Sequence, residues 1–152
     1  MATNAEKAIE IWKRLEGKPE GHGEWLKVEQ GRINQFADAT GDHQWIHLDQ
    51  ERAKSGPFGS TIAHGYLTLS LIPVLAKDIY RVENVTMVVN YGLNKVRFPS
   101  PVKVGSRVRG TAELLDITDV PGGKQAVTKF TVEIEGSDKP ACVAETVSRI
   151  IR

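Results

Sequence analysis

A change of pattern midway along the chain constrains its fold more than any other feature. From residue 86 onward, segments rich in strand-forming residues follow one another, separated by clusters of Gly, Pro and Asp. Consecutive strands joined by such short connections pair in antiparallel fashion, so this half of the chain predicts an antiparallel sheet. The predicted strands are residues 87–91, 94–98, 107–117, 125–135 and 141–151.

The first half of the chain carries helical signals instead. Thr3-x-x-Glu6 has the form of a capping box, and the apolar residues after it recur at helical spacing until Gly17, which predicts a short amphipathic helix. A short strand is predicted at residues 25–28. The helix that follows is predicted to end at Gly41, because glycine tolerates the left-handed conformation that closes many helices.

A third helix is predicted at residues 66–79, where the chain is apolar on nearly every face. Such a helix is stable when it is buried on all sides, and Pro73 is expected to kink it. An antiparallel sheet that curls around this one helix is an α+β fold. We therefore expect one domain over residues 1–152, with an N-terminal helix and loop at 1–24 and a core at 25–152.

Composition narrows the class of protein. The 152 residues carry 20 basic and 19 acidic side chains, a net charge of +1, so the overall charge favours neither nucleic acid nor an anionic membrane. The N-terminus is too charged for a signal peptide, and no apolar stretch is long enough to span a membrane. Cys142 is the single cysteine, which excludes an intrachain disulfide and a multi-cysteine zinc site. These features predict a protein of the reducing cytoplasm.

Two side chains that could take part in acid–base catalysis follow Gly41 in the sequence. Asp42 and His47 are separated by an offset that turns side chains apart on a helix and sends them to opposite faces of a strand, so they converge only on an irregular loop. A carboxylate beside an imidazole can do acid and base work, because histidine titrates near neutrality. A simpler interpretation is also open, in which Asp42 caps the following turn and His47 is a buried, hydrogen-bonded histidine.

Gly65 opens the predicted buried helix. The backbone N–H groups of a first helical turn have no partner within the helix, and they can bind a carbonyl oxygen that gains negative charge. A glycine at this point leaves room for that oxygen to approach. Tight packing of the helix against the sheet explains the glycine equally well.

Three motifs occur in a fixed order along the chain: Thr40-Gly-Asp-x-x-x-Ile-His47, then Ala63-His-Gly65, then Phe98-Pro-x-Pro-Val-x-Val-Gly105. In this combination the chain resembles the MaoC-like dehydratases, which include the (R)-specific enoyl-CoA hydratases, and within them the nodulation-protein-N-like branch. The resemblance runs from about residue 28 to the C-terminus. Two positions depart from the enoyl hydratase pattern: Gln44-Trp45 replaces a usual Asn-Pro, and Pro73 replaces a frequent serine. Both departures bear on the choice of substrate.

The resemblance implies a fold and an activity. The fold would be a hot-dog domain, an antiparallel sheet wrapped around a long central helix, paired as a homodimer. The activity would be reversible hydration of a trans-2-enoyl-CoA to the (R)-3-hydroxyacyl-CoA. In this scheme Asp42 and His47 form the catalytic dyad on one water, and Gly65 contributes an N–H to the oxyanion hole. No metal or separate cofactor is expected, since coenzyme A is part of the substrate.

Further residues are assigned to substrate binding. Lys95 and Arg97 lie in a stretch without acidic residues, and at least one of them is expected to meet the phosphates of coenzyme A, although a solvated strand face has the same composition. Substrate binding is also expected to involve Gln44, Trp45, His64, Tyr66 and Asn90, although His64 is also explained as a residue that orients the entrance of the helix. Two other functions remain open at this point: a hot-dog acyl-CoA thioesterase, and an acyl-thioester binding module or carrier-protein dehydratase.

Overall fold

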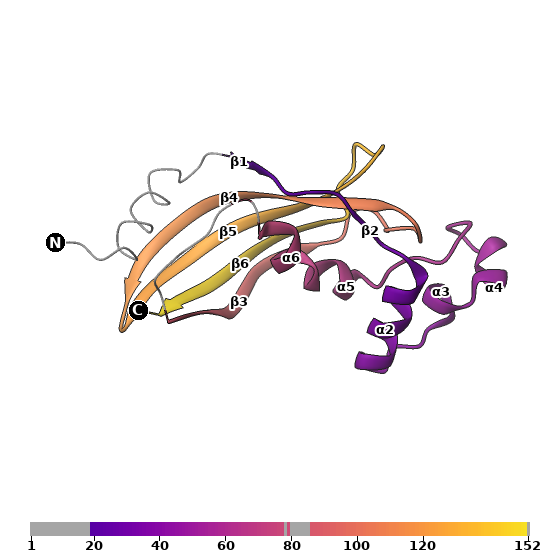
Figure 1. Cartoon of the computed structure of the whole chain (residues 1–152), viewed down its shortest axis with the longest axis horizontal. Coiled ribbons are helices and arrows are strands. Elements are labelled where there is room, and N and C mark those ends of the chain that lie inside the picture. The colour runs from indigo at the N-terminus through magenta and orange to yellow at the C-terminus, as the bar shows by residue number, and fades with distance from the viewer. Residues whose placement is uncertain (1–18, 78, 80–85, 152) are drawn as a thin grey trace.

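One antiparallel sheet is the largest element of the computed structural model, which describes residues 19–77, 79 and 86–151 (Figure 1). The strand order is β1-β4-β5-β6-β3, and β2 also pairs with β4. Every one of these pairings is antiparallel, as the sequence predicts. The strands are β1 (Pro19–His22), β2 (Leu26–Lys27), β3 (Met87–Arg97), β4 (Arg107–Val120), β5 (Gly123–Ile134) and β6 (Cys142–Ile151).

The sheet differs from the prediction in two places. The strands expected at 87–91 and 94–98 form the single strand β3, because bulges in its pairing with β6 shift the register without ending the strand. Residues 19–22, expected within an N-terminal loop, form β1 and pair with β4. The helix predicted at residues 3–17 lies outside the described residues.

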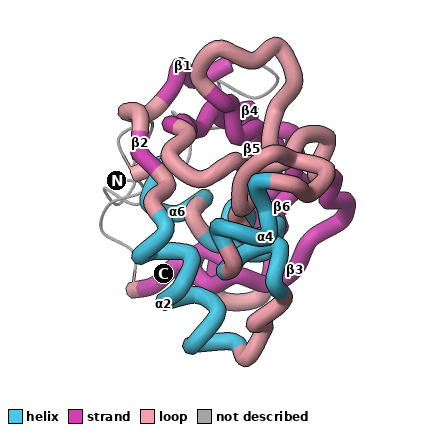
Figure 2. Tube along the Cα trace, turned by 90° about the vertical axis from the view of Figure 1, so that its right-hand side faces the viewer, coloured by secondary structure: helices cyan, strands magenta, loops and turns pink. Residues whose placement is uncertain are grey.

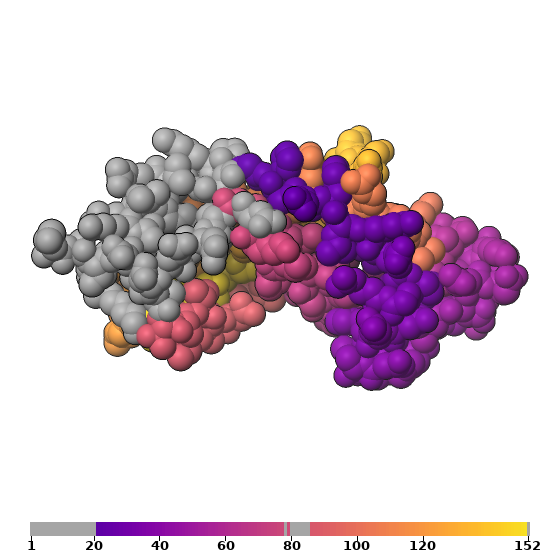
Figure 3. All heavy atoms as spheres, in the orientation of Figure 1, coloured from indigo at the N-terminus to yellow at the C-terminus, as the bar shows by residue number. Residues whose placement is uncertain are grey.

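Three helices gather at one end of the sheet, where they form a lobe in the space-filling view (Figures 1 and 3). They are α2 (Gln30–Thr40), α3 (Trp45–Leu48) and α4 (Gln50–Lys54). The predicted end of α2 is confirmed: Gly41 adopts φ 83°, and its N–H donates to the Ala37 carbonyl at 2.8 Å. The chain therefore leaves α2 in a new direction at the start of the loop that carries Asp42.

The prediction of one long central helix is wrong. The chain forms two short helices instead, α5 (Gly65–Ser70) and α6 (Ile72–Ala76), which join at Leu71. Pro73 lies in the first turn of α6, and a proline there cannot donate to the preceding turn and displaces the carbonyl four residues earlier. The N–H of Leu71 is shared between two carbonyls of α5 at 3.0 and 3.2 Å, a tightening typical of a helix end.

Helices α5 and α6 cover the concave face of the sheet, and the strands curve around them (Figure 2). Burial on every side, as predicted, is not observed, because Tyr66 is 71% exposed and Val74 is 39% exposed. The buried side approaches the sheet closely at Leu75. A Cβ at Gly110 would lie 3.1 Å from the Leu75 Cβ, and one at Gly23 would collide with the Leu75 carbonyl. These two glycines let α6 lie against β4.

The hydrophobic core fills the space between these helices and the sheet. Cys142 is fully buried there, and burial raises the pKa of its thiol to about 11, so it packs as an apolar side chain. In the part of the chain that the structure describes, no helix is long and apolar enough to cross a membrane. The largest fully buried apolar side chains are Ile33, Leu114, Ile150, Val28, Val108 and Val132.

Candidate active site

The three sequence motifs meet around residues 61–63. The N–H of Ile62, the residue before the second motif, donates to the carbonyl of Ile46 in the first motif at 3.1 Å. The N–H of Ala63 donates to the Val102 carbonyl at 2.8 Å, which joins the second motif to the third. Main-chain hydrogen bonds therefore hold the entrance of α5 against the loop that follows α2.

His47 lies on α3 and is buried, with 6% of its surface exposed. Its Nδ1 lies 2.7 Å from the Ile62 carbonyl oxygen; because a carbonyl only accepts, Nδ1 carries the proton and Nε2 of the neutral ring keeps its lone pair. The Gln30 amide donates to the His47 carbonyl at 2.7 Å, and the Thr61 hydroxyl donates to Gln30 at 2.6 Å. These contacts fix the imidazole in the tautomer that a base needs.

The surroundings of His47 also set its charge. Burial is the main reason that the pKa of His47 lies below its ordinary value of 6.5, and the hydrogen bond to the Ile62 carbonyl offsets part of this decrease. The nearby His64, which lowers the pKa, and the Asp42 carboxylate, which raises it, have smaller effects. At neutral pH the imidazole is therefore neutral and able to accept a proton from water.

Asp42 lies beside His47 on the exposed loop that Gly41 begins. A carboxylate oxygen of Asp42 and ring nitrogens of His47 and His64 all lie within 4.8 Å of one another. Two hydrogen bonds of about 2.8 Å that meet at one water oxygen span a distance of this size. The N–H of Gln44 lies 3.4 Å from Oδ1 of Asp42 and helps to orient the carboxylate. The structure thus brings the predicted pair to a separation that one bridging water spans.

These three side chains have the composition of a metal site but not its geometry. The rings of His47 and His64 stack, with centroids 3.8 Å apart and planes inclined by 24°. A metal ion lies about 2.0–2.1 Å from each imidazole nitrogen that binds it, close to the ring plane. Nearly parallel stacked rings point their lone pairs side by side rather than at one ion. We therefore assign no metal to this cluster.

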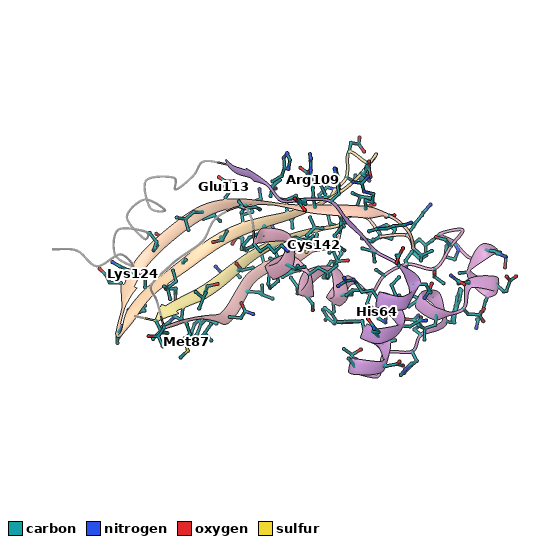
Figure 4. All side chains as sticks on the ribbon, in the orientation of Figure 1. His64, Met87, Arg109, Glu113, Lys124 and Cys142 are labelled. Carbon is teal, nitrogen blue, oxygen red and sulfur yellow. The ribbon has the colours of Figure 1, made fainter. Side chains whose placement is uncertain are left out.

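His64, expected at the acyl pocket, lies in the interior with 2% of its surface exposed. Its Nε2 donates to the Asp42 carbonyl oxygen at 2.9 Å. On the side of α2, the Phe36 ring lies 4.9 Å away, inclined by 58°. The contacts of His64 are thus with the protein, and Figure 4 shows the residue among the helices at the end of the sheet.

Gly65 is the first residue of α5, and no hydrogen bond among the described residues uses its N–H. A Cβ built on Gly65 would lie 3.3 Å from the ring of Phe98. Phe98 is 42% exposed and meets Tyr66 edge-on, with centroids 6.3 Å apart. Both interpretations of the glycine therefore find support: an N–H open to an acceptor, and a close contact that a side chain would disturb. The close contact is with Phe98 rather than with the sheet.

Two neighbouring residues that the sequence assigned to the substrate separate in the structure. Gln44 precedes α3 and borders Asp42 through its main-chain N–H. The ring of Trp45 packs in the other direction: the Arg52 guanidinium lies 4.1 Å from its centroid, and a Cβ at Gly56 would lie 3.4 Å from the ring. Trp45 thus contacts α4 and the turn after it.

Of the other residues predicted to bind substrate, Tyr66 lies on α5, and Asn90, Lys95 and Arg97 lie on β3. Asn90 lines a cavity of about 640 Å³ between α5–α6 and strands β3, β5 and β6. Neither Asp42 nor His47 lines this cavity. Lys95 and Arg97 are exposed, and the Arg97 guanidinium donates to a neighbouring main-chain carbonyl at 2.8 Å. The structure therefore places Asn90, Lys95 and Arg97 along one strand, and only Asn90 lines the cavity.

Two residues that shape the site were not found from the sequence. Gln30 anchors the main chain of His47 from α2, and a glutamine at a helix start carries no signal of that role. Phe98 covers the Cα of Gly65, and it belongs to the third motif, so the motif was the signal that was available.

The sequence was compared with family models and with known proteins. Residues 13–136 match the model of the MaoC like domain. The chain is 56% identical over 136 residues to 3-hydroxyacyl-thioester dehydratase Z of Mycobacterium tuberculosis, covering 89% of this chain and 90% of that protein. It is 47% identical over 138 residues to nodulation protein N of Rhizobium leguminosarum bv. viciae, covering 88% and 85%.

A solved structure agrees with the fold. The R-hydratase PhaJ1 from Pseudomonas aeruginosa, in its unliganded form, superposes with a TM-score of 0.72 at 22% identity, covering 90% of this chain and 82% of that one. The fold is thus of the α+β hot-dog type, with an antiparallel sheet. The chain belongs to the MaoC-like dehydratase family, and as a member of it the protein is a hydro-lyase.

Proposed function

We propose that the protein reversibly adds water to a trans-2-enoyl thioester to give the (R)-3-hydroxyacyl thioester, with Asp42 and His47 acting on one water. The observation that carries the proposal is their pairing within 4.8 Å, with Nδ1 of His47 bound to Ile62. The relative of 56% identity is named a 3-hydroxyacyl-thioester dehydratase, which supports a thioester substrate.

The chemistry assigns one task to each group. Nε2 of His47 accepts a proton from the water while the water oxygen bonds to the β-carbon, and the protonated ring returns a proton to the α-carbon. Asp42 accepts a hydrogen bond from the second O–H of the water and so orients it, and this hydrogen stays on the oxygen as the hydroxyl of the product. Both additions occur on one face of the double bond, because one water and one imidazole supply them. The thioester oxygen becomes enolate-like, and the N–H of Gly65 stabilises it.

The acyl chain is assigned to the cavity of about 640 Å³. The cavity begins at Leu69, which follows Gly65 by one helical turn, about 6 Å along the axis at about 1.5 Å per residue. Leu69, Ile72 and Phe130 supply part of its apolar wall. A thioester carbonyl at Gly65 would therefore direct its chain along α5 into this space.

Lys95 and Arg97 are assigned to the phosphate of the carrier. Both are exposed cations on β3, and each can reach a phosphate in solution without losing a buried partner. Coenzyme A and an acyl carrier protein both present the acyl group on phosphopantetheine, so the same cations serve either carrier. We propose coenzyme A, and the assay below distinguishes the two.

We propose that a second copy of the chain pairs along β3. This strand lies at one end of the strand order, so in the described part of the sheet its outer edge has no partner. An edge strand with several exposed apolar side chains is a ready template for a second strand. The exposed apolar residues of β3 are Met87, Val88, Val89, Tyr91 and Leu93.

We place the protein in the cytoplasm. The support is Cys142, the single cysteine of the sequence, whose thiol is buried in the core and stays protonated. Tagging the protein at its C-terminus and separating cell fractions tests this assignment, with recovery in a secreted fraction as the opposing result.

The decisive assay follows the absorbance of enoyl thioesters. Crotonyl-CoA, a longer trans-2-enoyl-CoA and the same acyl groups on a carrier protein are incubated with the protein, and the product is separated on a chiral phase. We expect loss of enoyl absorbance with the CoA substrates and formation of the (R) product. Release of free thiol without hydration would instead indicate a thioesterase. Binding of the thioesters with neither reaction would indicate a binding module.

A further inference from the structure

His64 connects the parts of the site that lie on different elements. It occupies the N-cap position of α5, directly before Gly65, and its ring contacts Phe36 of α2 and His47 of α3. With 2% of its surface exposed, it is more deeply buried than His47. A polar ring placed at such a junction needs an explanation, because burying it costs free energy unless its hydrogen bonds are made.

The hydrogen bonds of His64 define its tautomer. Nε2 donates to the Asp42 carbonyl at 2.9 Å, so the proton is on Nε2. Nδ1 is buried and has no hydrogen-bond partner in the part of the chain that the structure describes. A second proton on Nδ1 would create a buried, charged donor without an acceptor, which is strongly unfavourable. The geometry therefore assigns the donating proton of His64 to Nε2.

The main chain at Asp42 has few other anchors. Its own N–H lies 3.4 Å from the Thr40 hydroxyl, and its carboxylate lies 3.4 Å from the N–H of Gln44. Both contacts are long, local and exposed. The bond from His64 is shorter, and it reaches across 22 residues of sequence to the entrance of α5. It is the contact that fixes the loop relative to Gly65.

We propose that His64 is a positioning residue of the reaction: its Nε2–H holds the Asp42 loop, and its ring holds the His47 ring by stacking. The proposal rests on the proposed function, because it concerns the same water and the same two groups. One residue then sets the distances among the carboxylate, the imidazole and the N–H of Gly65. A displacement of about 1 Å in such a site can cost about 10²-fold in rate.

Two substitutions separate the hydrogen bond from the stacking. His64→Phe keeps a planar ring of similar size but removes the donor, and we expect kcat to fall about 10- to 100-fold with KM changed less than about threefold. His64→Gln keeps an N–H donor and is expected to recover part of that loss. The matched control is His43→Gln. His43 is an exposed histidine of the same loop, and its ring bonds to the Asp38 carboxylate instead of to the site. Its kcat should remain within about twofold of the wild type.

Two measurements by nuclear magnetic resonance make the test independent of activity. In the wild type, the ¹⁵N shifts of His64 should report the Nε2–H tautomer. In His64→Phe, amide exchange at Gly41, Asp42 and His43 should become faster, and in His64→Gln it should return toward the wild type. An Nδ1–H tautomer, or unchanged exchange and unchanged kcat in folded His64→Phe, would overturn the proposal. A wild type without hydration activity would reject the proposed function, while the tautomer and the exchange would still decide the role of His64.

Discussion

The surroundings of Asp42, His47 and His64, here called the corner, bury polar side chains, whereas the edge strand β3 exposes apolar ones. In the corner, His47 and His64 are 6% and 2% exposed, and each donates to a main-chain carbonyl. Along β3, Val88 and Tyr91 are 54% and 64% exposed. Met87, at the start of β3, lies at the far end of the sheet from His64 (Figure 4).

In most proteins apolar side chains are buried and polar side chains are exposed, and each region departs from this arrangement for a different reason. Buried histidines cost solvation free energy, and the corner offsets this cost with hydrogen bonds that also fix two tautomers. Exposed aliphatic and aromatic residues on an edge strand favour association, and β3 offers them beside an unpaired edge in the described sheet. We assign proton transfer to the first region and assembly to the exposed residues of β3 that do not line the acyl cavity, such as Val89. Substitutions of the dyad should therefore affect activity, and a substitution at Val89 should affect oligomeric state.

The largest expected effect concerns the dyad. Asp42→Asn and His47→Ala should each lower the rate of enoyl thioester hydration by about 10²–10⁴-fold, because each removes a group that handles a proton of the water. The rate is measured by enoyl absorbance, and circular dichroism checks the fold. If either variant folded correctly and kept a near-normal rate, the assigned mechanism would be wrong.

The second effect concerns Gly65 and its contact with Phe98. Gly65→Val should lower turnover by about 10²-fold, since the side chain must displace the Phe98 ring and crowds the N–H. Gly65→Ala should show a smaller loss, because its Cβ needs a shift of only a few tenths of an ångström from the ring. Turnover and melting temperature are measured for both variants. Large losses of stability with turnover preserved per folded molecule would assign Gly65 to packing alone.

The third effect tests whether β3 serves assembly. Val89→Glu places a charge on the exposed edge strand and should raise the dimer dissociation constant more than tenfold, since an unpaired charge buried at an interface costs about 2 kcal/mol or more. Thr118→Glu, at an exposed position of β4, is the control and should leave the dimer intact. Light scattering across a concentration series measures both. A wild type that is monomeric and active would contradict the assignment.

The smallest effect is a dependence of stability on pH. Because the pKa of His47 is lowered in the folded protein, chiefly by burial, the unfolded chain takes up its proton near pH 6.5 and the folded protein only at lower pH. Below pH 6.5 the unfolded state binds more protons, so stability falls as the pH falls, by at most about 1.4 kcal/mol per pH unit. Above this pH His47 makes its full contribution to the free energy of unfolding.

This dependence is measured as a difference between two proteins. Urea unfolding of the wild type and of His47→Ala at several pH values isolates the contribution of His47 from that of other groups. The wild type should lose more stability than the variant between pH 7 and pH 5. Identical slopes for the two proteins would show that burial does not hold His47 in its neutral form.

The sequence predicts local features well at positions where only one residue type suits the backbone conformation. Gly41 ends α2 as predicted, because the left-handed conformation strongly favours glycine. The antiparallel sheet follows from alternation and short connections. The predicted length of the central helix was wrong: the apolar run suggested one continuous helix, whereas a new helix begins at Ile72 with Pro73 in its first turn.

The candidate site was predictable in its parts but not in its assembly. The loop after Gly41 indicated that Asp42 and His47 could converge, and the structure brings them together. The burial of His64 and its bond to the Asp42 carbonyl depend on contacts between α2, α3 and α5, which no local pattern encodes. Gln30 is a further example, because its role exists only once α2 and α3 pack together.

The central claim is that Asp42 and His47 act on one water held between them. Hydration of crotonyl-CoA in D₂O tests it most directly, because the proton coupling constants of the product show on which face of the double bond each group was added. The account predicts a single diastereomer in which the hydroxyl and one deuterium are added to the same face, at the (R) configuration. A mixture of diastereomers, or addition to opposite faces, would contradict it.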